Sequence, residues 1–125
     1  MKKQRPVNLN FSTICFPLTA IISILHRISG VITFFSIGIL LWLLGLSLSS
    51  PKNFLEVSTI INSLHFKFIA WVLVSTLSFH FIGGIRHLIM DFGLISTTLK
   101  TGKISSKVVL GSSILLAILS GVVIW

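Results

Sequence analysis

One histidine, His80, lies inside an apolar stretch over residues 69–90 that is long enough to cross a membrane as a helix. Ionisable side chains within membrane segments are costly to bury and by default mark a functional site. Imidazole is also a common ligand for metals and for haem iron. This residue type at this depth therefore allows three roles: a metal or haem ligand, a proton relay, or a neutral imidazole that bonds to a neighbouring helix.

Four residues share one stripe of this helix, at offsets of four, seven and eleven: His80, Gly84, His87 and Asp91. His80 lies about 10 Å deeper in the membrane than His87. The glycines at 83 and 84 leave space beside the imidazole, as a flat group such as a porphyrin requires. The other histidines lie near the membrane surfaces: His26, His65 and His87. If haem binds at His80, we expect its second axial ligand to come from another chain.

A second polar group stands at the start of the first apolar stretch. Ser23, His26 and Arg27 share a helix face, because their offsets are three and four. Arginine stays charged and offers up to five hydrogen-bond donors. The group could bind a carbonyl oxygen, a propionate or a lipid phosphate, and an ordinary basic membrane anchor is the alternative.

The elements that must position these residues are membrane helices. Of the 125 residues, 54% are hydrophobic and 10% are charged, whereas soluble domains carry about 25% charged residues. Three apolar stretches, 28–48, 69–90 and 108–125, each approach the ~20 residues that span a bilayer. We therefore predict an all-α membrane protein and a single membrane-anchor domain over residues 1–125. Its segments are an N-terminal part (1–22), three spans (23–49, 68–90 and 107–125) and two loops (50–67 and 91–106).

The net charge of +8 is unevenly distributed along the chain. Basic residues cluster at the start of the first span and around the second loop: Lys2, Lys3, Arg5, Arg27, Arg86, Lys100, Lys103 and Lys107. The positive-inside rule places the N-terminus and the second loop in the cytoplasm, and the C-terminus in the periplasm. Because the membrane flanks account for this charge, it does not indicate a nucleic-acid partner.

Several classes of function are disfavoured by what the sequence contains. A single cysteine, Cys15, allows no internal disulfide and no four-cysteine cluster, so any iron–sulfur centre must belong to a partner. The polar N-terminus is not followed by the short apolar core of a cleaved signal peptide. The only carboxylates, Glu56 and Asp91, are expected on opposite sides of the membrane, which excludes paired-carboxylate hydrolysis.

Two stretches of the chain resemble signatures of a known family. Arg5-Pro6-Val7, followed by SILHRISG at residues 23–30, resembles the first signature of the cytochrome b556 subunit of succinate dehydrogenase. HFIGGIRH at residues 80–87, continuing to MDFG at residues 90–93, resembles the second. The likeness covers nearly the whole chain and is greatest to the bacterial subunit. Phe11 and Cys15 depart from it, since an aliphatic and a basic residue are expected there.

This resemblance implies a role for each matching residue. His80 would be an axial ligand to haem b, and a second small anchor subunit would supply the other ligand. Ser23 and Arg27 would line a ubiquinone site, and His26 and Arg27 would lie near the haem propionates. The chain would be a non-catalytic subunit that contributes to the quinone-reduction site.

The resemblance also implies partners and a location. A flavoprotein and an iron–sulfur subunit would dock on the cytoplasmic face of the bacterial inner membrane. There they would pass electrons from succinate, in the tricarboxylic acid cycle, to quinone in the aerobic respiratory chain. A cofactor-free structural anchor and the anchor of a quinol:fumarate reductase are the alternatives.

Overall fold

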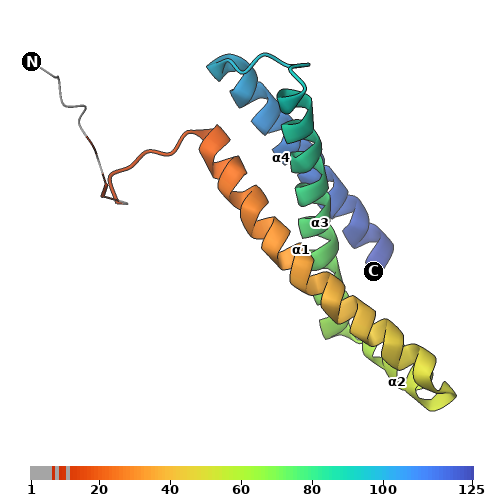
Figure 1. Cartoon of the computed structure of the whole chain (residues 1–125). Coiled ribbons are helices and arrows are strands. Elements are labelled where there is room, and N and C mark those ends of the chain that lie inside the picture. Colours follow the sequence, from red (N-terminus) through yellow and green to blue (C-terminus); the bar gives the residue numbers. More distant parts are fainter. Residues whose placement is uncertain (1–6, 8, 11) are drawn as a thin grey trace, which may run out of the picture.

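The computed structural model describes residue 7, residues 9–10 and residues 12–125 as a set of helices without strands (Figure 1). The helices are α1 (Leu18–Ser49), α2 (Pro51–Ile61), α3 (Leu64–Asp91) and α4 (Leu99–Ile124). Three of them, α1, α3 and α4, are long and apolar enough to cross a membrane. The prediction of an all-α protein with three spans is therefore confirmed. Lys2, Lys3 and the Arg5-Pro6 part of the first motif lie outside the described residues.

The helices extend beyond the membrane segments expected from hydropathy. α1 begins directly after Pro17, whose own backbone is extended and whose ring restricts the residue before it. Only Ser50 separates α1 from α2, so most of the predicted loop over residues 50–67 is helical. Pro51 is the first residue of α2, a position where its fixed φ angle and missing N–H are tolerated.

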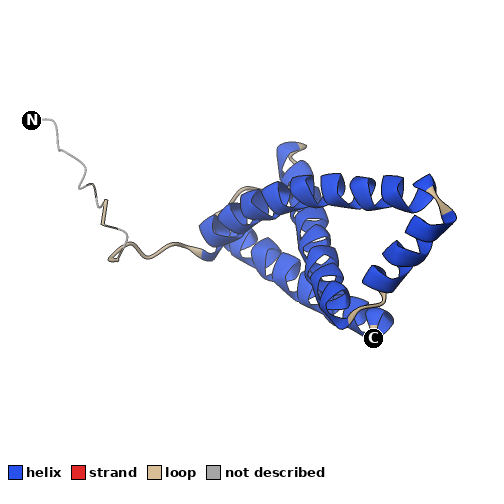
Figure 2. Cartoon of the chain, turned by 90° about the horizontal axis from the view of Figure 1, so that it is seen from below, coloured by secondary structure: helices blue, strands red, loops and turns tan. Residues whose placement is uncertain are grey.

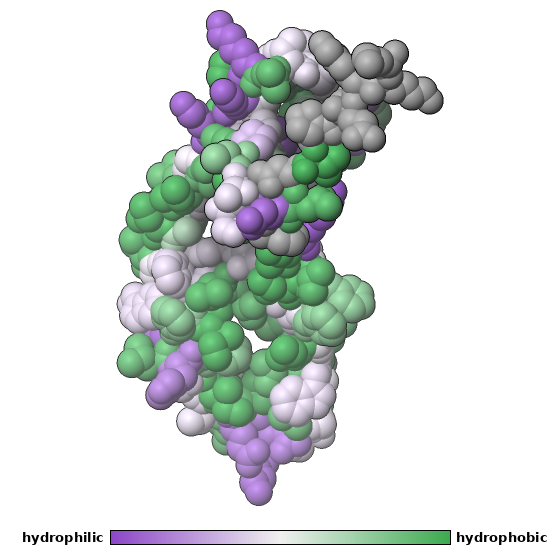
Figure 3. All heavy atoms as spheres, turned by 90° about the vertical axis from the view of Figure 1, so that its left-hand side faces the viewer, coloured by the Kyte–Doolittle hydropathy of each residue, from purple (hydrophilic) through white to green (hydrophobic). Residues whose placement is uncertain are grey.

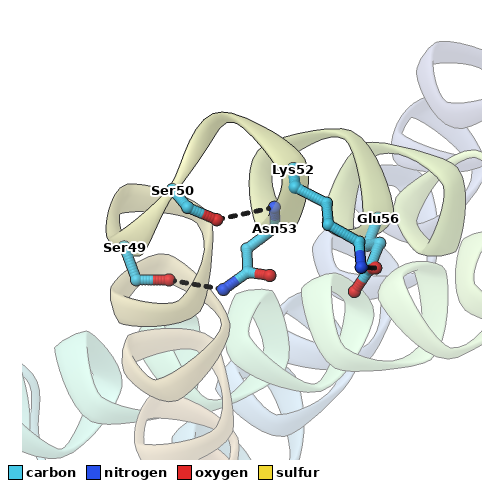
Figure 4. A network of polar contacts seen from close by, with 5 residues as sticks. All are labelled: Ser49, Ser50, Lys52, Asn53 and Glu56. Atoms are coloured by element: carbon cyan, nitrogen blue, oxygen red, sulfur yellow. Dashed lines mark hydrogen bonds and ion pairs between the residues drawn. The ribbon is translucent and has the colours of Figure 1, made fainter.

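The corner between α1 and α2 is held by side-chain hydrogen bonds (Figure 4). Ser50 caps α2, since its Oγ accepts from the backbone N–H of Asn53 at 3.1 Å. The Asn53 amide donates to Ser49 Oγ at the end of α1, at 2.7 Å. Lys52 and Glu56, one turn apart on α2, approach to 3.9 Å at the surface. These bonds reverse the chain within one residue, and α2 then leads back to α3 (Figure 2).

The loop between α3 and α4 is shorter than the predicted segment 91–106. α3 ends in a Schellman motif, in which Gly93 has φ +68 and the N–H of Leu94 bonds to the carbonyl of Ile89 at 3.1 Å. Glycine adopts this left-handed conformation without strain, so Gly93 suits the end of the helix. Gly102 lies inside α4, where a Cβ would stand 3.1 Å from Thr19 Cγ2 of α1.

The exterior is largely apolar, whereas the few buried positions hold both apolar and polar side chains. α3 packs against both α1 and α4, whereas α1 and α4 touch less extensively. The buried residues include small hydroxyl groups and one guanidinium: Ser29, Ser36, Ser106, Ser113 and Arg86. Most large apolar side chains are exposed instead, and they cover much of the face in Figure 3, whose lower tip is hydrophilic. This arrangement is typical of helices that use lipid as solvent and small residues as contacts.

At the end of the molecule away from the α3–α4 loop, two tryptophans join α3 to α4. Trp71 Nε1 donates to the carbonyl of Ala117 at 2.7 Å, and its ring meets that of Trp125 edge-on at 6.3 Å. The two residues thus lie at the same end, where we expected the outer membrane surface. Trp71 therefore bonds helices together in addition to any contact with headgroups.

Candidate functional site

The site is built where α1 crosses α3, around a pair of histidines. The rings of His26 and His80 are stacked, with centroids 4.3 Å apart and planes 8° from parallel. His26 Nε2 lies 3.0 Å from the carbonyl oxygen of His80. A carbonyl only accepts, so this nitrogen of His26 carries the hydrogen. The sequence placed the two histidines in separate groups, and the structure brings them together.

Each imidazole lies against a glycine of the opposite helix. A Cβ at Gly30 would stand 2.9 Å from His80 Cε1, and a Cβ at Gly83 would stand 2.6 Å from His26 Cδ2. Neither distance is tolerated between carbon atoms. The space that we expected Gly83 and Gly84 to leave for a porphyrin is thus occupied by the ring of His26. Of the three glycines on α1, only Gly30 provides a close approach, since Gly38 and Gly45 have no neighbour within 4 Å.

The hydroxyl of Ser29 links the two histidines on their other edge. Ser29 Oγ donates to the carbonyl of His26 at 2.7 Å and lies 3.0 Å from His80 Nδ1. That Nδ1 is also 3.2 Å from the His26 carbonyl. The hydroxyl of Ser29 has one hydrogen, which it donates to the carbonyl of His26. Its oxygen can therefore only accept a hydrogen bond from His80, so Nδ1 of His80 is the donor. The unprotonated nitrogen of a neutral His80 is then Nε2.

This arrangement fits one axial ligand to a haem. Histidines that bind metals usually donate their other ring N–H to a carbonyl or carboxylate, as His80 Nδ1 does here. Nε2 of His80 makes no hydrogen bond to the described residues. His26 cannot be the opposite ligand, because its ring faces His80 in parallel and its Nε2 is engaged. The described residues also contain no group of three metal-binding side chains.

His87 completes a row of three imidazoles. Its ring centroid is 5.0 Å from that of His26, and the two planes are tilted by 57°. His26 therefore lies between the two histidines that the α3 stripe had grouped with Gly84 and Asp91. The sequence could not reveal this, because His26 enters from a different helix.

Ser23 and Arg27 remain free of partners on the α1 face. Ser23 is half-buried and Arg27 is exposed, and their side chains have no hydrogen bond or ion pair within the described chain. His26, the third member of that predicted group, turns instead towards α3. The hydroxyls on α3 behave differently, since they bond back to carbonyls of their own helix: Ser75, Thr76 and Ser78. Ser23 and Arg27 thus keep donors available for a ligand.

Arg86 makes a contact inside the protein. Its side chain is buried, and its Nε donates to Ser105 Oγ on α4 at 2.9 Å. It borders a cavity of about 330 Å³ between α3 and α4 that is otherwise mostly apolar. The sequence did not indicate that Arg86 and Ser29 are buried and make polar contacts with another helix. For Ser29 a signal existed, because it follows His26 by three residues on one helix face.

The chain is similar to a family of membrane proteins along nearly its whole length. Residues 1–120 match the family model described as succinate dehydrogenase/fumarate reductase transmembrane subunit. The succinate dehydrogenase cytochrome b556 subunit of Coxiella burnetii is 37% identical over the whole of both chains. That of Rickettsia felis is 33% identical over 93% of this chain and 90% of its own length. That of Paracoccus denitrificans is 28% identical over 96% and 92%.

These matches confirm the resemblance drawn from the two motifs. Together with the three apolar helices they make the chain a multi-pass protein of the bacterial cytoplasmic membrane, as predicted. The chain belongs to the family of succinate dehydrogenase/fumarate reductase transmembrane subunits.

Proposed function

We propose that this chain is the membrane-anchoring cytochrome b subunit of a succinate:ubiquinone oxidoreductase. It binds haem b jointly with a second small anchor subunit and docks a flavoprotein and an iron–sulfur subunit. The observation that carries the proposal is His80, a half-buried imidazole in a membrane helix whose Nδ1 is bonded and whose Nε2 is free. The names of the relatives, which include cytochrome b556, support haem as the ligand.

His80 Nε2 would hold the haem iron on one side, and the partner anchor subunit would hold it on the other. Ligation on both sides would leave no open position on the iron, which suits electron transfer or structural support better than oxygen chemistry. His26 and Arg27 would lie near the haem propionates. The exposed guanidinium of Arg27 is free to bind a carboxylate with two parallel hydrogen bonds.

Ser23 and Arg27 would form this chain's part of the ubiquinone site. Negative charge develops on the quinone oxygen as the quinone is reduced, and donors aimed at that oxygen stabilise the charge. Both side chains have donors that are not used within the described chain. Placement at the cytoplasmic boundary would allow protons to enter from water and keep the quinone within reach of the iron–sulfur partner.

The orientation of the chain is part of the same proposal. The first turns of α4, next to the α3–α4 loop, carry exposed lysines: Lys100, Lys103 and Lys107. The positive-inside rule puts them, and the start of α1, on the cytoplasmic side. The soluble subunits would dock at that face. Trp125 and the C-terminus would then lie at the periplasmic side.

Replacement of His80 by Leu tests the proposal. We expect the purified complex to lose the reduced-minus-oxidised absorption and the low-spin spectrum of a haem with two axial ligands. Replacement of the exposed His65 by Leu is the matched control and should leave both spectra unchanged. An unaltered axial-ligation spectrum in His80→Leu would remove His80 from the haem site. A colourless wild-type complex would instead favour a cofactor-free anchor.

A quinol:fumarate reductase is the second candidate, since the description of the matching family names both enzymes. The direction of the reaction depends on the quinone potential and on the catalytic subunits. Comparing the rates of succinate oxidation and fumarate reduction in the purified complex separates the two.

A further inference from the structure

Ser29 is buried at the crossing of α1 and α3, with only 4% of its surface exposed. Buried serines in membrane helices commonly satisfy their hydroxyl by bonding back to their own helix. Ser36 on the same helix does only this, donating to the carbonyl of Ile32 at 2.6 Å. Ser29 also donates to its own helix, at the carbonyl of His26, but its oxygen lies 3.0 Å from His80 Nδ1 as well. The two serines are therefore alike in burial and differ in one contact.

We propose that Ser29 is a positioning residue for haem binding by His80. Its Oγ accepts the Nδ1–H of His80 and so holds the imidazole in the tautomer whose Nε2 lone pair can bind iron. The inference rests on the proposed function, because it supposes that His80 is the haem ligand. Its basis is the set of three contacts among Ser29 Oγ, the His26 carbonyl and His80 Nδ1.

The other contacts of the His80 ring do not select its tautomer, whereas this hydrogen bond does. The ring of His26 covers one face of the imidazole, and Gly30 lies against its Cε1 edge. These apolar contacts restrict how the ring tilts, but they do not distinguish Nδ1 from Nε2. Only acceptors placed at Nδ1 make that distinction, and Ser29 Oγ is the nearer of the two at 3.0 Å. Rotating the ring by half a turn would bring a carbon to Ser29 and leave the serine oxygen without its donor.

The effect of removing Ser29 is expected to be partial. The carbonyl of His26 lies 3.2 Å from the same nitrogen and remains as a weaker acceptor. Loss of an outer hydrogen bond to a metal-binding histidine typically weakens metal binding by about 10- to 100-fold. We expect a loss of about tenfold, at the lower end of this range.

Four variants of the full chain in the purified complex test the inference: Ser29→Ala, Ser29→Val, Ser29→Thr and Ser36→Ala. Thr and Val have the same shape, so the Ser29→Thr and Ser29→Val pair differs by the hydroxyl alone. Haem affinity is measured by titrating haem into complex prepared without it. The low-spin electron paramagnetic resonance spectrum and the haem reduction potential report on the ligand itself.

We expect Ser29→Ala and Ser29→Val to bind haem about tenfold more weakly, with shifted g values and potential. Ser29→Thr and Ser36→Ala should match the wild type. Haem affinity and spectrum within twofold of wild type in both Ser29→Ala and Ser29→Val would overturn the inference. So would an equal loss in Ser29→Thr and Ser29→Val, because the hydroxyl would then be irrelevant.

The two proposals fail in distinguishable ways. If His80→Leu retains the ligation spectrum, the proposed haem site is wrong and the role of Ser29 falls with it. If His80→Leu loses the spectrum while the Ser29 variants are unchanged, only the role of Ser29 is wrong. A folding defect in Ser29→Ala would appear as reduced helical circular dichroism, and the comparison of Ser29→Thr with Ser29→Val then decides the question.

Discussion

The imidazole of His26 lies parallel to that of His80 at 4.3 Å, and its Nε2 donates to the carbonyl of the same His80. The pair therefore ties α1 to α3 through one stacked contact and one hydrogen bond. The His26 ring also lies against Gly83. Both the shape of the ring and its Nε2–H therefore contribute to the packing of α1 against α3. The site is thus part of the helix packing and not a group of side chains added to a finished scaffold.

Replacing His26 by Phe should separate the hydrogen bond from the ring contact. Phe retains a flat ring but has no donor, so we expect the free energy of unfolding to fall by about 1 kcal/mol. His26→Ala also removes the ring and should cost about 3 kcal/mol. Unfolding is followed by circular dichroism in mixed detergent micelles. The matched control is His65→Phe at an exposed position, which should change little. Full stability of His26→Phe would show that the bond to His80 contributes nothing.

Adding a methyl group at Gly83 should destabilise the crossing of α1 and α3. The new Cβ would stand 2.6 Å from His26 Cδ2, and overpacking of this kind typically costs about 1–3 kcal/mol. The same change at Gly111 meets no atom within 4 Å. There it should be neutral or stabilise α4 by up to about 1 kcal/mol. Unfolding of the two variants in the same micelles gives the comparison. Equal stability would show that His26 does not fill the space at Gly83.

Replacing Arg27 by Leu should reduce quinone turnover without affecting stability. The guanidinium is exposed and has no bond within the described chain, so its loss leaves no internal group unpaired. Removing a donor to a developing negative charge typically costs about 10²-fold in rate. Succinate–quinone reductase activity of the complex is measured against quinone concentration. Lys52→Leu, at an exposed basic residue of α2 away from the docking face, is the control. Unaltered turnover and quinone affinity in Arg27→Leu would exclude Arg27 from the quinone site.

The lone cysteine provides a direct test of topology. Cys15 is exposed just before α1, so a cytoplasmic N-terminus predicts its labelling by a membrane-impermeant maleimide in inside-out vesicles only. Lys52→Cys combined with Cys15→Ser moves the label to the exposed start of α2. That variant should react in right-side-out vesicles. Reaction of Cys15 from the periplasmic side would reverse the orientation derived from the positive charges.

The helices and the family could be predicted from sequence because their signals are local. Hydropathy over about 20 residues identifies a span wherever it packs, and two short motifs identified the family. Helix ends were less predictable. Ser50 and Pro51 replace a longer expected loop, since the Ser50 cap and the preset φ of proline reverse the chain without extra residues. Helical structure also continues past the point where apolar residues give way to polar ones, as at the start of α4.

The sequence by itself determined that His80 needs a partner in a membrane helix and that Ser23, His26 and Arg27 share a face of another. Only the tertiary structure decided that His26 leaves that group to stack on His80, that Ser29 bonds its Nδ1, and that Gly30 and Gly83 make room for the rings. The reason is physical. Periodicity fixes which residues share a face of one helix, whereas the contacts between helices depend on their relative rotation and depth. Those are set by the few small residues that allow close approach.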